Sequence, residues 1–282
     1  MNPFSNNTPA INPEQVYLSI GGIGLELQSH STNLLRAIAS HYAAFVGVGD
    51  LPGKIQVTIY WKKENRSTQP FLPAVEFLGQ NILFTASGCR GTYAISQGMA
   101  ELFLDVQDPF ERLEYFLRLI VGFAAFDKGG FLFHGAGIAH KDHGIVFFGP
   151  SGAGKTTVSR FSVHDKVLND DLILMFPSQT GWTIHSTPFW NPTQVKPYPT
   201  SVTLSGMFRL IQARSVFCEK PGKATSLAEI TSNIPVLCTD PQRGEELMHR
   251  VAKILDVIPV YRLHFLKDDT FWKVVDATLQ IG

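Results

Sequence analysis

Residues 149–156 constrain this chain more than any other segment. They read Gly-Pro-Ser-Gly-Ala-Gly-Lys-Thr and fit G-x-x-x-x-G-K-[ST], the pattern of a phosphate-binding P-loop. Glycines at this spacing let the backbone curl so that several N–H groups point at one phosphate chain. The candidate nucleotide-binding residues are Gly149, Pro150, Ser151, Gly152, Ala153, Gly154, Lys155, Thr156 and Thr157.

The segments on both sides of the motif also fit a P-loop. The apolar run 144–148 predicts a buried strand before it, and residues 156–161 predict a helix after it. This order presents backbone N–H groups to a phosphate. Lys155 is expected to reach the terminal phosphates, and Thr156 to offer its hydroxyl to Mg²⁺. The alternative is a glycine turn that contains Lys-Thr by chance.

Composition and charge exclude several classes of protein. The 282 residues suffice for one large domain or two modest ones. Hydrophobic residues make up 44% of the chain, which allows a sizeable core and argues against disorder. The 24 basic residues balance the 24 acidic ones, so no nucleic-acid partner is expected.

No targeting or membrane segment is expected. Residues 1–10 are polar and do not fit a signal peptide. The most apolar stretch, 116–126, is too short to span a bilayer and contains Arg118, so it predicts a buried helix. The cysteines are scattered, at Cys89, Cys218 and Cys238. They form neither a zinc pattern nor an even set, which favours a reducing, cytoplasmic setting.

Two modules are predicted along the chain. Residues 1–107 form a β-rich module with one helix at 33–45, which we expect to take part in acceptor recognition, and residues 108–282 form the P-loop domain. Strands of the first module are expected at 16–20, 23–27, 55–61, 74–78, 82–86, 91–95 and 99–106.

The second module alternates helices and strands. Asp108-Pro109 predicts the start of a helix that ends near Gly129-Gly130. Residues 177–200, rich in Pro, Thr and aromatic residues, are expected to form a long loop. Further strands are expected at 131–139, 172–176, 202–211 and 259–265, and helices at 240–255 and 268–279.

A pair of acids, Asp170 and Asp171, follows Lys155 by 15 and 16 residues. A kinase needs one carboxylate for Mg²⁺ and another to orient and deprotonate an acceptor hydroxyl. Two adjacent acids can divide these tasks. The alternative is a solvated Asx turn between two strands.

His134 lies on the strand expected just before the P-loop strand. Two hairpin strands would bring it near the phosphate site, where it could bind a phosphate or hold a catalytic carboxylate. The alternative is a core histidine whose ring is satisfied by a backbone carbonyl.

Together, His134-Gly135, the strand 145–148, the P-loop and Asp170-Asp171 resemble the catalytic domain of HPr kinase/phosphorylase. They also resemble the smaller HPr-kinase-related kinases of bacteria and, more distantly, ATP-dependent phosphoenolpyruvate carboxykinase. The resemblance covers residues 134–176. It implies an α/β fold with α+β character, in which a carboxykinase-type P-loop mixed sheet with flanking helices follows the smaller β-rich N-terminal module.

The resemblance also implies an ATP- and Mg²⁺-dependent kinase. Lys155 and the loop backbone would hold the β- and γ-phosphates, and Thr156 and Asp171 would serve the metal. Asp170 would act as base toward the acceptor hydroxyl, and His134 would support the phosphate site. The catalytic residues would therefore be Asp170, His134 and Lys155.

The chain departs from HPr kinase downstream of the acid pair. HPr kinase has a Glu-Ile-Arg-Gly segment tied to metal binding and to its phosphorylase activity, whereas residues 186–191 here contain no acid. This favours a related kinase with a different acceptor. Such relatives often lie beside machinery for ribosomally made peptides, so the expected acceptor is a Ser or Thr hydroxyl of a peptide or protein. Because HPr kinases are hexamers, a homo-oligomer is also implied.

Other interpretations stay open. The aromatic residues of the 177–200 segment could form a lid over the acceptor or fix the segment to the core; they are Trp182, Phe189, Trp190 and Tyr198. The whole protein could be a non-catalytic nucleotide-sensing scaffold or a small-molecule kinase. A carboxykinase-like metabolic enzyme would need a basic cluster for a dicarboxylate, and the sequence has none that stands out.

Overall fold

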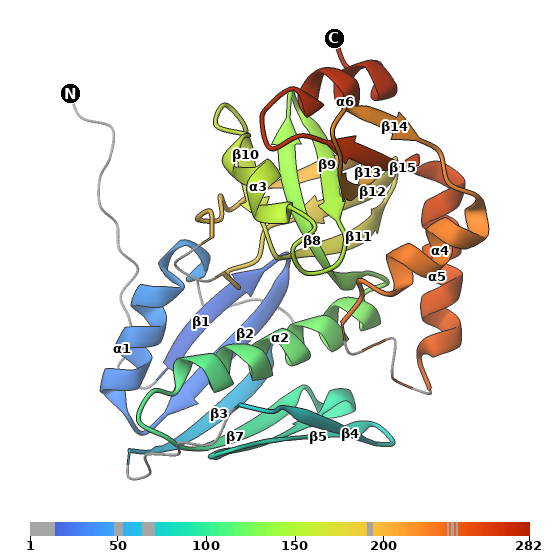
Figure 1. The fold of residues 1–282 in the computed structure, drawn as a ribbon. Helices are drawn as coiled ribbons and strands as arrows, with labels where there is room; N and C mark the ends of the chain where they lie inside the picture. Colours follow the sequence, from blue (N-terminus) through green and yellow to red (C-terminus); the bar gives the residue numbers. More distant parts are fainter. Residues whose placement is uncertain are drawn as a thin grey trace, which may run out of the picture. The chain divides into compact units, whose positions relative to one another are not determined.

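The structure is a computed structural model that describes residues 15–47, 53–63, 71–190, 194–235, 237, 240 and 242–282. Residues 1–10, Asn191 and Cys238, on which expectations were stated above, lie outside these ranges. The chain divides into two compact units, Met1–Ile120 and Val121–Gly282, called here the N-terminal unit and the P-loop unit. Each unit contains one mixed sheet, and the described residues form six α-helices (Figure 1). The α/β class is confirmed.

The N-terminal unit is built on a seven-stranded sheet with the order β1-β2-β3-β7-β6-β5-β4. All seven expected strands are present, and their ends differ from the expected ones by at most two residues. Their bounds are β1 Gln15–Ile20, β2 Ile23–Ser29, β3 Ile55–Lys62, β4 Ala74–Leu78, β5 Asn81–Ala86, β6 Cys89–Ala94 and β7 Met99–Asp105.

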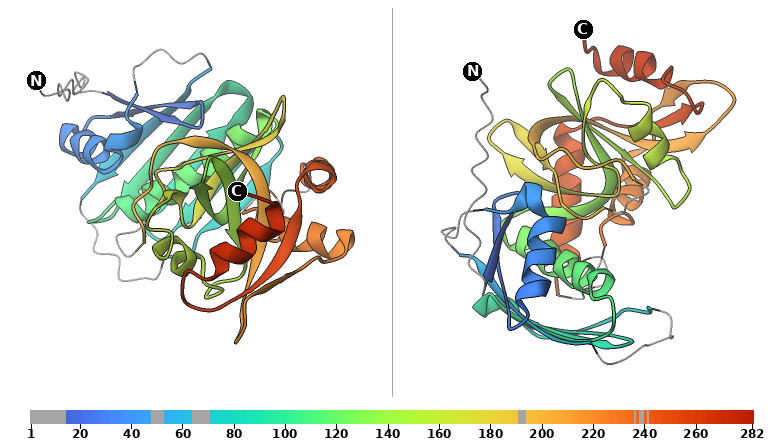
Figure 2. Two further views of the ribbon diagram at one scale, coloured as in Figure 1. Left: turned by 90° about the horizontal axis from the view of Figure 1, so that it is seen from above. Right: turned by 90° about the vertical axis from the view of Figure 1, so that its left-hand side faces the viewer.

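Helices cover one face of this sheet. Helix α1 (Thr32–His41) packs on β1 and β2, and its first turn is capped by the Ser31 hydroxyl, which accepts from the Leu34 N–H at 3.2 Å. The first part of α2 (Phe110–Asp127) lies on the same face (Figure 1, Figure 2). A Cβ added to Gly91 would lie 2.6 Å from the Phe116 ring, so the glycine lets α2 approach the sheet.

The predicted start of α2 is confirmed, because the Asp108 carboxylate accepts a hydrogen bond from the Phe110 N–H at 3.0 Å. The apolar stretch 116–126 lies inside this helix. Among the described residues, no helix combines the length and the apolar character needed to cross a bilayer.

The P-loop unit contains an eight-stranded sheet organised by two long strands, β8 (Phe131–His140) and β13 (Ser201–Gln212). Strand β8 pairs with β9, β10 and β11, and β13 pairs with β9, β12 and β15. The pairings β8–β9–β13–β12–β11–β8 therefore form a closed circuit. The other strands are β9 His143–Phe148, β10 Lys166–Asn169, β11 Leu172–Ser178, β12 Gly181–His185, β14 Phe217–Glu219 and β15 Val260–Phe265.

Strand direction determines where the chain leaves this sheet. Strands β9, β13 and β15 are mutually parallel, and β10 runs the same way because both β9 and β10 are antiparallel to β8. The carboxyl ends of these four strands consequently meet at one edge of the sheet. In open α/β sheets this edge is where ligands bind.

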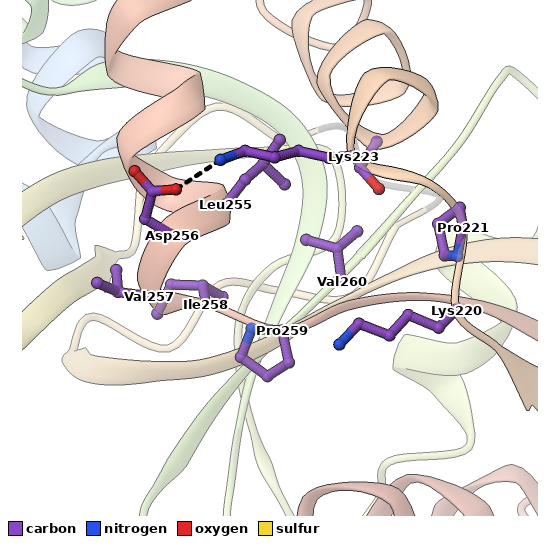
Figure 3. Close-up of a pocket in the computed structure, with 10 residues that line it drawn as sticks. Lys220, Pro221, Lys223, Leu255, Asp256, Val257, Ile258, Pro259 and Val260 are labelled. Atoms are coloured by element: carbon purple, nitrogen blue, oxygen red, sulfur yellow. Dashed lines mark hydrogen bonds and ion pairs between the residues drawn. The ribbon is translucent and has the colours of Figure 1, made fainter.

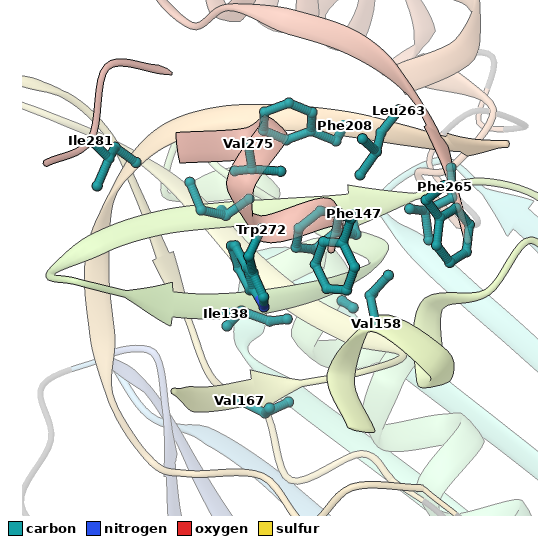
Figure 4. Packing of buried hydrophobic residues seen from close by; sticks show 14 residues of the cluster. Ile138, Phe147, Val158, Val167, Phe208, Leu263, Phe265, Trp272, Val275 and Ile281 are labelled. Carbon is teal, nitrogen blue, oxygen red and sulfur yellow. The ribbon is translucent and has the colours of Figure 1, made fainter. Parts of the chain in front are cut away.

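An aromatic core fixes strand β9 in place. Phe147 is fully buried, and its ring centroid lies 5.8 Å from Phe208, 5.7 Å from Phe271 and 5.5 Å from Trp272. The last two residues belong to helix α6 (Phe271–Leu279), which covers this face of the sheet (Figure 4).

The expected long loop at residues 177–200 is wrong in part, because β12 lies within it and pairs with β11 and β13. Trp182 and Ile184 are buried and alternate with half-buried positions. The prolines and threonines around this short alternation hid it in the sequence. Strand β14 and helix α4 (Lys223–Thr231) were also not expected, whereas α5 (Gly244–Val257) matches an expected helix.

Candidate phosphate-binding site

Strand β9 runs directly into the P-loop. Backbone φ is 148° at Gly149, 78° at Gly152 and 119° at Gly154, values that side-chain-bearing residues rarely adopt. At Gly154 space is also limiting, because an added Cβ would lie 2.5 Å from Cζ of Phe265. Helix α3 (Lys155–Arg160) follows, so the expected order of strand, glycine loop and helix is present.

Two side chains donate hydrogen bonds to backbone carbonyls of the loop. The Gln212 side-chain amide at the end of β13 donates to the Gly152 carbonyl at 2.8 Å. The Lys155 ammonium folds back and donates to the carbonyls of Gly149 at 2.9 Å and Pro150 at 3.4 Å. Burial lowers the pKa of Lys155, and Asp171 and then Asp170 oppose that shift. These hydrogen bonds satisfy three backbone carbonyls of the loop.

A cavity of about 340 Å³ lies over the loop. Six of the nine candidate nucleotide-binding residues line it, namely Ser151, Gly152, Gly154, Lys155, Thr156 and Thr157. His134, Asp170 and Asp171 line the same cavity, so the structure brings together the loop, the histidine and the acid pair. Gly149, Pro150 and Ala153 shape the loop beneath it.

A buried asparagine sets the direction of the acid pair. Asn169 is fully buried, and its side-chain oxygen accepts from the N–H groups of Asp171 at 2.7 Å and Leu172 at 3.0 Å. Its amide donates to the carbonyls of Thr187 at 3.1 Å and Phe189 at 2.9 Å. The segment after β12 therefore supports the turn that carries the two acids.

Asp170 is 1% exposed and incompletely satisfied. Its Oδ2 accepts from the Val195 N–H at 3.4 Å, and the carboxylate also accepts from the Thr156 hydroxyl. Its Oδ1 is buried and has no hydrogen-bond partner among the described residues. Burial raises the pKa of Asp170, while the bonds from Val195 and Thr156 oppose this. A buried carboxylate oxygen facing no protein donor is free for a ligand.

Asp171 lies beside His134. Their Oδ1 and Nε2 atoms are 3.0 Å apart, with side chains 24% and 40% exposed. Contact with a carboxylate is one of the roles expected for His134, and the structure shows it. The two acids therefore have different neighbours: Asp170 contacts Thr156, and Asp171 contacts His134.

The donors present fit Mg²⁺ only together with phosphate oxygens. Within the described ranges, no group of three or more His, Cys, Asp or Glu residues could hold a metal ion by itself. Mg²⁺ is usually held by one or two carboxylates, waters and substrate phosphates. The Thr156 hydroxyl, the free oxygen of Asp170 and the nearby Asp171 supply such a set.

The aromatic residues of the 177–200 segment are divided between the core and the surface. Phe189 is fully buried, and Trp182 is 5% exposed and lies 5.7 Å from the ring of Phe131. These two fix the segment to the core. Tyr198 is 50% exposed, with the Lys166 ammonium 5.1 Å from its ring centroid.

Three residues that the sequence did not suggest also line the cavity: Gln194, Gln212 and Lys267. Gln212 ends β13, and Lys267 follows the last residue of β15 by two positions. Strand β13 pairs in parallel with both β9 and β15, and no local pattern in the sequence reveals these pairings.

A family model described as SynChlorMet cassette protein ScmC matches residues 112–280 of the chain, and these residues include the whole site. No curated protein matches the chain. Because the match covers more than half of the chain, the protein belongs to the SynChlorMet cassette protein ScmC family.

Proposed function

We propose that this protein is an ATP- and Mg²⁺-dependent kinase that transfers the γ-phosphate to a hydroxyl, namely a Ser or Thr of a protein or ribosomally made peptide. The observation that carries the proposal is the convergence, in one cavity, of the P-loop lysine, the Thr156 hydroxyl and a buried carboxylate with one free oxygen. The resemblance of residues 134–176 to HPr-kinase-related kinases supports it.

We also propose that the P-loop unit has the carboxykinase-type fold. In its support, the P-loop strand β9 has an antiparallel neighbour, β8, on one side and a parallel neighbour, β13, on the other. An ordinary P-loop ATPase would have a mainly parallel sheet around the loop. The closed circuit of five strands is a further departure from that arrangement.

The residues act mainly by positioning and charge. The loop N–H groups and Lys155 bind the phosphate chain. To do so, the Lys155 ammonium gives up its hydrogen bonds to the Gly149 and Pro150 carbonyls and donates to phosphate oxygens instead. Mg²⁺ held by Thr156 and Asp171 would supply positive charge against the charge that develops on the transferring group. Asp170 accepts the proton of the acceptor hydroxyl, and its raised pKa makes it a stronger base than an exposed carboxylate. Asp171 and Thr156 serve the metal.

One observation favours the opposite assignment of roles to Asp170 and Asp171. Thr156, the P-loop metal ligand of this proposal, contacts Asp170, whereas Asp171 pairs with His134. Asp170 would then join Thr156 at the metal, and Asp171, oriented by His134, would receive the hydroxyl proton. The two assignments differ in which carboxylate binds Mg²⁺, and therefore in which substitution raises the Mg²⁺ concentration needed for transfer.

The test is transfer of labelled γ-phosphate from Mg²⁺-ATP into a pool of peptides and proteins, with products identified by mass spectrometry. Asp170→Asn is expected to lower transfer by about 10²–10⁴-fold while ATP binding is retained, because general-base catalysis contributes about that much. Asp142→Asn is the matched control, since Asp142 is an exposed residue of the β8–β9 turn with φ 65°. Normal transfer by Asp170→Asn would contradict the role of Asp170.

Asp171→Asn in the same assay distinguishes the two assignments of roles to Asp170 and Asp171. The carboxylate that holds the metal is the one whose amide variant needs more Mg²⁺ for half-maximal transfer. The other variant is expected to lose rate at every Mg²⁺ concentration.

The second candidate is a non-catalytic nucleotide-sensing scaffold. It is favoured by the segment 186–190, which supplies no acid where HPr kinase has one. This candidate predicts ATP binding with no labelled product from wild type. It also predicts different proteolysis patterns with ATP and ADP.

A further inference from the structure

We propose that Lys267 is a second phosphate-binding residue of this cavity, which contacts the polyphosphate of the nucleotide together with Lys155. This inference rests on the proposed binding of a nucleotide, and it concerns a residue outside the P-loop motif. Lys267 is exposed at its position after β15 and lines the same cavity as Thr156 and Asp170.

The backbone before Lys267 is firmly held against the P-loop. Phe265, the last residue of β15, is 1% exposed, and its ring fills the space that a side chain at Gly154 would need. Its carbonyl accepts from the Ala213 N–H at 3.0 Å. Since Phe265 supports the loop itself, the Lys267 side chain starts from a fixed point close to the loop.

The backbone after Lys267 is also held. The Asp268 carboxylate accepts hydrogen bonds from the N–H of Thr270, at 3.0 Å, and from its hydroxyl. Helix α6 begins at the next residue, and Phe271 is fully buried in the core. Lys267 is therefore a flexible side chain carried by a short connection that is fixed at both ends.

Two lysines and two carboxylates line the cavity. Asp170 and Asp171 carry two negative charges where they are ionised, and Lys155 alone cannot balance them. With Lys267 these four side chains sum to zero, and Lys267 adds attraction for a polyphosphate to that of Lys155 and the proposed Mg²⁺. Among the ion pairs formed by the described residues, none includes Lys267. Its charge is therefore available to a ligand.

A second cavity, of about 430 Å³, shows a different arrangement of lysines. It lies between α4, α5 and β15, and there the Lys223 ammonium pairs with Asp256 at 2.6 Å (Figure 3). Much of its remaining wall is apolar. Lys220 also lines this cavity and is exposed, which makes it a matched control for Lys267.

The test is calorimetric titration of the full-length chain with ATP, ADP and AMP in the presence of Mg²⁺. Lys267→Gln is expected to weaken binding of ATP and ADP about tenfold, or about 1.4 kcal/mol, because one charge-assisted hydrogen bond to the polyphosphate is lost. Binding of AMP is expected to change less, because it lacks the polyphosphate. Lys267→Arg should keep most of the affinity, and Lys220→Gln all of it.

The outcomes separate this inference from the proposed kinase. Unchanged ATP affinity in Lys267→Gln, with normal wild-type binding, overturns the inference alone. Loss of ATP and ADP affinity in Lys267→Gln supports it, whether or not wild type transfers phosphate. An equal loss of affinity for AMP overturns it, because the residue then acts on the nucleoside or the fold. No binding of ATP by wild type overturns both proposals.

Discussion

The two sheets of this protein use their strands differently. In the N-terminal unit, β3 and β7 alternate buried and exposed residues, so one face is covered by helices and the other is open. In the P-loop unit, β8 and β9 are buried over almost every residue. The open face of β3 and β7 exposes a stacked pair, Tyr60 and Phe103, with ring centroids 4.6 Å apart.

This difference explains where the chemistry-bearing residues gather. A strand buried on both faces cannot present a polar side chain along its length without a large cost in desolvation. Polar residues therefore collect where β9, β10, β13 and β15 end, at the edge that holds the P-loop and the acid pair. The one-sided sheet has no such restriction, and its polar residues spread over the open face.

The largest expected effect is on stability. Phe147→Ala in β9 removes a fully buried ring with three aromatic neighbours and is expected to lower the free energy of unfolding by about 3–5 kcal/mol. Tyr60→Ala on the open face is expected to cost less than about 1 kcal/mol. Urea unfolding of both variants checks this. Equal shifts in the midpoint would show that the two sheets do not differ as described.

A smaller loss of stability is expected when Asn169, which supports the turn carrying Asp170 and Asp171, is replaced. Asn169→Ala leaves four backbone groups without their partner and is expected to cost about 2–3 kcal/mol. Phosphate transfer should fall further than stability explains, because Asp171 loses its fixed direction. Asn81→Ala, at an exposed position of β5, is the control in the N-terminal unit and should change neither quantity. Full activity in a folded Asn169→Ala protein would exclude the positioning role.

The smallest effect is a gain in stability. Burial raises the pKa of Asp170, so the wild-type protein loses stability as pH rises through that pKa and the carboxylate ionises. Asp170→Asn carries no such charge, and we expect it to be more stable by about 1 kcal/mol at neutral pH. The gain should shrink as pH falls below the pKa of Asp170, where both side chains are neutral. Thermal unfolding across pH measures it.

Asp105→Asn serves as the control for that experiment. Asp105 is exposed at the end of β7, and its substitution should leave the melting temperature unchanged at every pH. A gain in Asp105→Asn equal to that in Asp170→Asn would assign the effect to net charge and not to burial.

Local patterns predicted most of the elements correctly. The alternation of β3, β6 and β7, the Asp108 cap of α2 and the turn before β9 are all readable within a few neighbouring residues. The β12 strand was missed because its alternation covers only five residues within a segment rich in proline and threonine. Helix α4 begins without a side-chain cap, so no start signal marked it.

Residue type and close spacing were enough to predict the P-loop with its flanking strand and helix, and to name His134, Asp170 and Asp171 as candidates. The contacts of Asp170 with Thr156 and of Asp171 with His134 could be seen only in the folded chain, as could the presence of Gln212 and Lys267 in the same cavity. Those relations depend on the register and direction in which distant strands pair, and strand pairing is set by packing of the whole sheet, not by any short stretch of chain.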